Sequence, residues 1–134
     1  MITKITLKEK AKLVKLLQEK IWIECRRIIR ARYPHDCYTC GAKDLVGANL
    51  HTGHFIAKKA VKNYLKYDLR ILRPQCYFCN MKCGGQGALY YRNMVAREGQ
   101  EYVDLIFADL DKKIAPKDLY EFYTDLYNKY VAMS

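Results

Sequence analysis

The sequence predicts an α+β fold that is mostly helical, with a small core between a long N-terminal helix and C-terminal helices. Three observations predict it: an apolar stripe with helical spacing near the start, a glycine-punctuated middle with two Cys-x-x-Cys pairs, and helical periodicity towards the end. A chain of 134 residues suits one compact domain. We therefore expect a single domain, 1–134, made of an N-terminal helix (1–33), a core (34–98) and C-terminal helices (99–134).

The first helix has clear start and stop signals. Thr6 and Glu9 form a capping box, in which each side chain accepts a hydrogen bond from the other residue's backbone N–H. Pro34 ends the pattern, so we expect a helix to about Arg32. Such a helix is longer than a small core needs, and it can lie along DNA, along a second subunit or on its own core. One stripe carries its apolar residues, Val14, Leu17, Ile21, Cys25 and Ile28.

The middle of the chain predicts short elements. We expect a strand near 45–50, a turn at His51 to Gly53 and a second strand from His54 to about Ala57. A helix should start around Tyr77 to Asn80, with an interruption at Gly84-Gly85, and a further helix should run from Ala88 to Arg97.

The end of the chain predicts two more helices. The pattern is helical from Gly99 to Lys113, and Pro116 takes a favourable first position of the last helix. That last helix has a broad aromatic face but is acidic, so we favour packing or dimerisation of this face over stacking on DNA bases.

The cysteines predict a zinc site. Cys37/Cys40 and Cys76/Cys79 form two Cys-x-x-Cys pairs, the usual ligand set of a closed tetrahedral zinc site. The sequence shows no signal peptide and no apolar run of membrane-spanning length, so we expect a cytoplasmic protein with reduced thiols. Cys83 follows the second pair and is either a packing residue or a spare zinc ligand.

The charge predicts a polyanionic partner. The net charge of +10 is uneven: residues 1–97 hold 20 Lys/Arg and 6 Asp/Glu, which gives +14, and residues 98–134 hold 4 and 8, which gives −4. A basic body suits DNA, although a basic surface can also be merely solvated. The candidate phosphate contacts are Lys58, Lys59, Lys62, Lys66, Arg70, Arg73, Lys82 and Arg92.

Two histidines and an asparagine add candidate chemistry. His51 and His54 lie between the cysteine pairs, and Asn80 directly follows the last cysteine. Histidine titrates near neutrality and suits a general base, whereas a divalent ion can neutralise charge in phosphodiester hydrolysis. A histidine in a turn can also be structural, and asparagine often caps a helix.

These motifs resemble those of the phage NinG (Rap) recombination family, whose members carry a zinc-knuckled HNH, or ββα-metal, nuclease motif. The resemblance covers roughly residues 33–106 and rests on His51-Thr-Gly-His54-Phe, Gln75-Cys76-x-x-Cys79-Asn80, Tyr91-Arg92 and Gly99-Gln-Glu. A looser likeness is to phage endonuclease VII, which also has two Cys-x-x-Cys pairs, a His-x-x-His and an Asn after the last Cys. Both resemblances imply cutting of branched DNA.

The resemblance also implies roles for individual residues. His54 takes the position of the general base, and Asn80 takes that of the metal ligand on the helix. HNH motifs commonly place Asp or His directly before the base, but this chain has Gly53 there, so His51 is the available substitute. Asp68 is a further candidate ligand, being the only carboxylate between His51 and Asn80. The implied cofactors are a structural zinc and a catalytic Mg or Mn.

A second departure from the motif concerns the residue that orients the base. The middle Asn of many HNH sites aligns with Ile71, so Arg70, Asn63 or a backbone carbonyl must orient the histidine.

Three function classes follow. We favour a metal-dependent, structure-specific endonuclease acting on branched, Holliday junction-like recombination intermediates, working as a homodimer in the cytoplasm of the host cell. The alternatives are a nonenzymatic zinc module that binds DNA and a sequence-specific HNH endonuclease of the nicking or restriction type.

Overall fold

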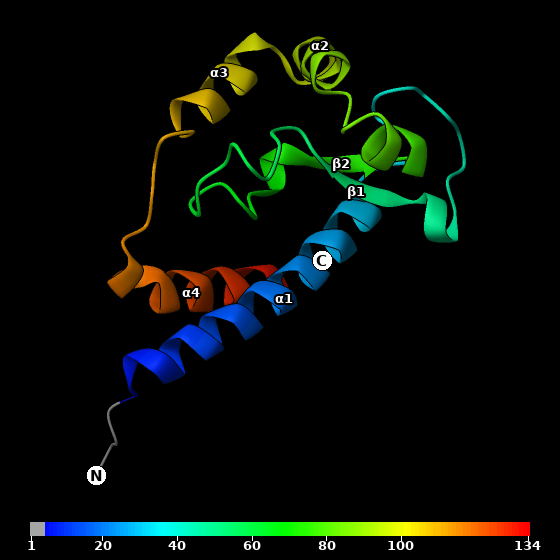
Figure 1. Ribbon diagram of the computed structural model, residues 1–134. Helices are drawn as coiled ribbons and strands as arrows, with labels where there is room; N and C mark the ends of the chain where they lie inside the picture. The colour runs from blue at the N-terminus through cyan, green and yellow to red at the C-terminus, as the bar shows by residue number, and fades with distance from the viewer. Residues whose placement is uncertain (1–4) are drawn as a thin grey trace. The chain divides into compact units, whose positions relative to one another are not determined.

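The computed structural model describes residues 5–134, and it is mostly helical with one two-stranded sheet (Figure 1). The chain forms two compact units. One unit joins the N-terminal part of the chain, up to Ile28, with Ile114–Ser134, and the other is Ile29–Lys113. Residues 99–113 lie in the second unit. No helix among the described residues is long and apolar enough to cross a membrane.

The first unit contains most of helix α1 (Leu7–Arg32). The predicted capping box is present, with the Thr6 amide 3.2 Å from Glu9 Oε2 and the Glu9 amide 3.1 Å from Thr6 Oγ1. These bonds satisfy two of the donors that a helix start leaves open. The helix predicted to end at about Arg32 is confirmed.

Helix α4 (Leu119–Val131) follows a 3-10 turn at Pro116–Asp118 and lies beside α1 within this unit (Figure 1). The Tyr123 hydroxyl accepts a hydrogen bond from Gln18 Nε2 over 3.4 Å. Arg27 donates to the carbonyls of Tyr130 and Met133, each over 3.0 Å. Aromatic residues of the last helix are thus used in packing within the chain.

The second unit is built on an antiparallel pair of strands, β1 (His51–His54) and β2 (Leu72–Gln75). Its register sets His51 opposite Gln75 and His54 opposite Leu72. This pairing corrects the predicted hairpin, since His51 to Gly53 is part of a strand and not a turn.

The predicted strand near 45–50 is also absent. The structure has a 3-10 turn at Gly47–Asn49 instead. The backbone is left-handed at Asp44 (φ 54°) and Gly47 (φ 56°), and such residues interrupt a strand. The partner of β1 is therefore supplied by the distant residues 72–75.

Helical segments follow the sheet. A short π-helix, η3 (Phe78–Lys82), takes the place of the helix expected after the second cysteine pair, and Gly84 and Gly85 with positive φ follow it. Helices α2 (Gly87–Glu98) and α3 (Gln100–Ala108) come next, close to the predicted spans except that α3 ends before Lys113.

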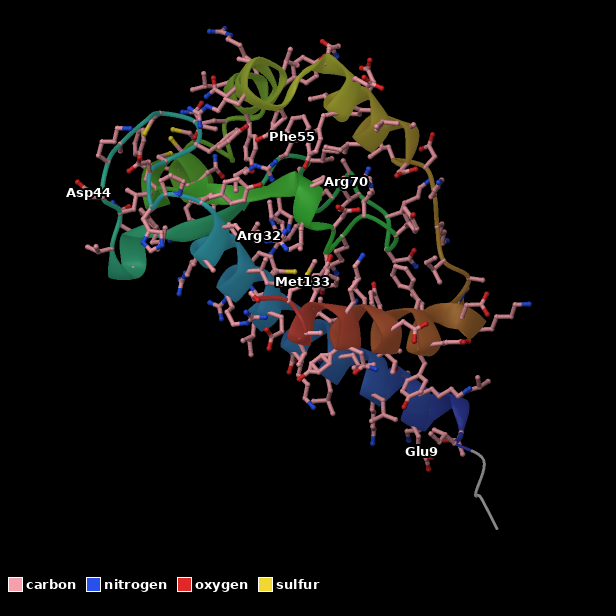
Figure 2. All side chains as sticks on the ribbon, turned by 180° about the vertical axis from the view of Figure 1, so that it is seen from behind. Glu9, Arg32, Asp44, Phe55, Arg70 and Met133 are labelled. Carbon is pink, nitrogen blue, oxygen red and sulfur yellow. The ribbon has the colours of Figure 1, made fainter. Side chains whose placement is uncertain are left out.

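Helices α2 and α3 lie on one side of the strand pair, with Phe55 between them and the strands (Figures 1 and 2). The Phe55 ring contacts Tyr90 of α2 at 5.3 Å and Phe107 of α3 at 5.8 Å between centroids. These contacts fix both helices against the sheet.

Gly53 is required by the packing of Gln75. A Cβ at Gly53 would lie 1.8 Å from Gln75 Oε1. The Gln75 side chain is buried and donates to Thr39 Oγ1 and to the Gly85 carbonyl, both over 3.0 Å. The missing side chain of Gly53 therefore makes room for a hydrogen-bonded glutamine in the core.

We expect Gly53→Ala to lower the free energy of unfolding by about 1–3 kcal/mol, because Gln75 must leave its place. In a Gln75→Ala background the same change should cost much less, and denaturant unfolding of the four proteins measures the difference. Gly87→Ala is the matched control, since an added Cβ there meets nothing within 4 Å. An equal cost of Gly53→Ala in both backgrounds would contradict this account.

Candidate metal and nucleic-acid site

The four predicted cysteine ligands come together. The sulfur atoms of Cys37, Cys40, Cys76 and Cys79 all lie within 4.8 Å of one another, and those of Cys40 and Cys76 are 3.8 Å apart. Sulfur atoms at the corners of a tetrahedron with metal–sulfur bonds of ~2.3 Å are about 3.8 Å apart. The cluster can therefore hold a structural metal such as zinc.

The surroundings of the cluster favour the thiolate form of Cys37. Burial opposes ionisation of Cys37, but hydrogen bonds from the Thr39 hydroxyl and from backbone amides lower the pKa of Cys37 to about 6. Burial raises the pKa of Cys76. Four thiolates this close repel one another, so a bound cation must replace thiol protons when the full ligand set forms.

His51 and Asn80 also come together. His51 is the first residue of β1 and lies opposite Gln75, the last residue of β2. After β2 the chain continues through Cys76 into η3, which carries Asn80. As a result, Asn80 Nδ2 lies 3.0 Å from His51 Nδ1. His51 Nε2 lies 2.9 Å from the Ala48 carbonyl oxygen. This carbonyl can accept only from a protonated Nε2, which leaves the Nδ1 lone pair facing Asn80.

His51 and Asn80 are the residues that could hold a divalent cation. Histidine ligands commonly donate their second ring N–H to a backbone carbonyl, as His51 does to Ala48. Rotating the Asn80 amide by half a turn presents its oxygen to His51. In the structure the two side chains are joined by a 3.0 Å hydrogen bond from the Asn80 amide to His51 Nδ1.

His54 lies at the other end of β1. Residues three apart in a strand point to opposite sides of it, so His54 and His51 face different sides. Burial, together with the charges of Lys58 and Lys66, lowers the pKa of His54 to about 4. His54 is therefore neutral at pH 7, and a pKa this low makes it a weak proton acceptor there. Among the described residues, the four cysteines are the only group of three or more His, Cys, Asp or Glu side chains placed to share an ion.

Asp68 is used in an ion-pair cluster. It accepts hydrogen bonds from the Arg70 amide and guanidinium at 2.9–3.0 Å, and Arg70 also donates to Asp109 at 2.9 Å. Figure 2 shows Arg70 beside the start of β2. At this end of the sheet Leu72 of β2 pairs with His54 of β1. The candidate ligand Asp68 is thus occupied away from the His51 and Asn80 pair, and Arg70 has two carboxylates as partners in place of phosphate.

Arg73 is a correction to the predicted phosphate contacts, because its side chain is only 1% exposed. Its guanidinium lies over the ring of Tyr33 at 4.7 Å and of Tyr38 at 5.6 Å. It also donates to the carbonyls of Leu69, Arg70 and Leu72. Arg73 is therefore a core residue that binds backbone and aromatic groups.

The other predicted cations are accessible to different degrees. Lys66 is half-buried, and Lys62 lies 3.7 Å from Asp111. The exposed ones are Lys58, Lys59, Lys62, Lys82 and Arg92.

The sequence did not indicate the polar network behind the site. Gln75 bonds Thr39, and Thr39 in turn contacts Cys37 Sγ at 3.3 Å. The Tyr90 hydroxyl donates to the Gly53 carbonyl over 3.0 Å. A glutamine next to Cys76 was the available signal, but only the structure reveals that its side chain fills the space left by Gly53.

Comparison with known families agrees with the motifs. The chain matches, over residues 1–131, the family model described as Bacteriophage Lambda NinG protein. It therefore belongs to the NinG family. No curated protein and no solved structure matches it.

We expect the purified protein to contain about one zinc per chain by elemental analysis, as four cysteines complete one tetrahedral site. Cys76→Ser should lose this zinc and unfold the core or lower its solubility, since binding energy here is folding energy. Cys83→Ser is the matched control because Cys83 lies outside the four-sulfur cluster. A metal-free parental protein of unchanged stability would refute the site.

Proposed function

We propose that the protein is a metal-dependent, structure-specific DNA endonuclease that acts on branched, Holliday junction-like recombination intermediates. The observation that carries the proposal is the His51–Asn80 contact, formed at the end of a strand pair next to the four-cysteine cluster. Two antiparallel strands followed by a helical turn that carries Asn80 are consistent with an HNH ββα-metal core. Membership of a phage protein family adds support.

The proposed roles follow from the chemistry of each side chain. The family resemblance gives His54 the role of accepting the proton of the attacking water, although its side chain and that of His51 face different sides of β1. His51 and Asn80 would hold the divalent ion, which when bound would stabilise negative charge on the phosphate and the leaving oxygen. Exposed cations such as Lys58, Lys59 and Lys82 hold neighbouring phosphates.

A branched substrate favours a two-fold assembly. Resolving a four-way junction takes two symmetric nicks, and a homodimer can deliver them almost together. We therefore propose a homodimer that binds branched DNA. Exposed apolar residues on α1, among them Leu16 at 50% and Ile23 at 55% exposure, are compatible with a subunit contact.

The deciding experiment incubates the parental protein with matched linear, flap, Y-shaped and four-way DNA, with and without Mg²⁺ or Mn²⁺. We expect metal-dependent cleavage of the branched molecules and a dimeric mass by light scattering. Binding without cleavage would favour a nonenzymatic zinc module. Defined cuts in linear duplex would favour a sequence-specific nicking or restriction-type enzyme, and a monomer that cuts linear and four-way DNA equally would be a general nicking nuclease.

Substitutions test the roles of the three site residues. We expect His54→Ala to reduce cleavage at least ~100-fold, as for loss of a general base, with DNA affinity kept within a few-fold because phosphates dominate binding. His51→Ala and Asn80→Ala should lose cleavage that a higher Mg²⁺ concentration partly restores, because they weaken ion binding.

The matched control is His35→Ala, since His35 is exposed and bonded to the Arg30 carbonyl. Cleavage by His54→Ala at the parental rate would show that another group is the base. Loss of activity in His51→Ala that no metal concentration changes would argue against ion binding there.

A further inference from the structure

An exposed apolar surface adjoins the candidate ion-binding pair. Tyr77, Phe78 and Met81 are 44%, 62% and 59% exposed, although all three are large apolar or aromatic side chains. They come from a single turn of the chain, η3 and the residue before it. We call these three residues the π-helix patch. Clustered exposure of this kind marks binding surfaces more often than chance does.

The patch is held in place by the same contacts that form the site. The Tyr77 ring meets the His51 ring edge-on at 5.6 Å between centroids. The Tyr77 amide donates to Asn49 Oδ1 over 2.9 Å. Asn80 lies within the same turn and contacts His51. A phosphate at His51 and Asn80 would therefore have its own nucleotide within reach of the patch.

Charge favours a nucleic acid over a protein as the occupant. Lys82 Nζ lies 6.0 Å from the Tyr77 ring centre. From His51 to Arg92 the sequence holds eight Lys/Arg and a single carboxylate, Asp68, and Asp68 is bound to Arg70. A surface that combines aromatic side chains with an exposed cation such as Lys82 matches the stacked faces and phosphates of DNA.

We propose that the π-helix patch binds unstacked bases of the DNA substrate, with Phe78 and Met81 against the exposed base face. In continuous duplex each base face is covered by its neighbours, whereas at a branch or a bulge a face is free. Apolar wedges such as Phe and Met enter DNA where stacking is already weak. The patch thus makes the protein prefer branched or interrupted DNA. This inference rests on the proposed function of the neighbouring pair.

The test is DNA affinity of the zinc-loaded protein without added Mg²⁺ or Mn²⁺, so that no cleavage is needed. The three ligands are a four-way junction, a duplex with a one-nucleotide bulge and an unbroken duplex of equal length. We expect Phe78→Ala to lose about tenfold of the preference for junction and bulge, as for one lost stacking contact. Phe78→Tyr keeps the ring and should keep the preference.

Affinity for unbroken duplex and the salt dependence of binding should stay unchanged in Phe78→Ala, because phenylalanine carries no charge. Leu105→Ala is the control, since Leu105 is 58% exposed on α3 and should have no effect on the preference. An equal loss on all three ligands means a structural role and overturns the inference, as does an unchanged preference.

A third outcome is also decisive. If Phe78→Ala leaves the preference intact but turns a dimer into a monomer by light scattering, the patch is a contact between two copies and the inference is wrong. Failure of the proposed function is a separate result. If the parental protein never cuts DNA but Phe78→Ala lowers the preference for junctions, the inference holds and the proposed function fails. If the protein cuts branched DNA and Phe78→Ala leaves the preference unchanged, the proposed function holds and the inference fails.

Discussion

The arrangement of the second unit depends on the convergence of the four cysteines. Cys40 and Cys76 are separated by 36 positions in sequence, yet their sulfur atoms are 3.8 Å apart. The surrounding cluster of buried residues is small, with Leu45 and Leu50 as its aliphatic members beside three of the cysteines. So few apolar contacts contribute little to the free energy of folding, and a bound metal can supply the remainder. The position of η3, and with it Asn80, follows from this junction.

Polar groups in the core connect the cysteines to the strand pair. Gln75 links Thr39 and Gly85, and Arg73 binds three carbonyls and the rings of Tyr33 and Tyr38. A buried guanidinium is tolerated because carbonyl acceptors and aromatic faces surround it and the Glu98 carboxylate lies 3.5 Å away. The two residues alternate with Leu72 and Pro74 along β2, so one side of this strand is held by hydrogen bonds and the other by apolar packing.

The sequence predicted those features whose signals are local. The capping box of Thr6 and Glu9 and the two cysteine pairs act over three residues, and each can be read without knowing the fold. The partner of β1 could not be read in this way. A strand pairs with whichever edge the fold brings to it, and the left-handed residues Asp44 and Gly47 removed the nearer candidate. The sequence suggested that Arg73 contacts phosphate. The pairing of β1 with β2 instead buries its side chain, and that pairing could not be predicted locally.

The same distinction explains how charge is distributed in the second unit. A count of charges along the sequence separates a basic body from an acidic end. Asp109 and Asp111 belong to that acidic end but lie within the second unit, where they pair with Arg70 and Lys62. Ion pairs near the surface contribute little stability, yet they neutralise cations that DNA would otherwise meet. Lys82 and Arg92 have no such partner within salt-bridge distance among the described residues. The positive charge left available therefore lies partly beside η3, where Asn80 meets His51, and not evenly along the basic run.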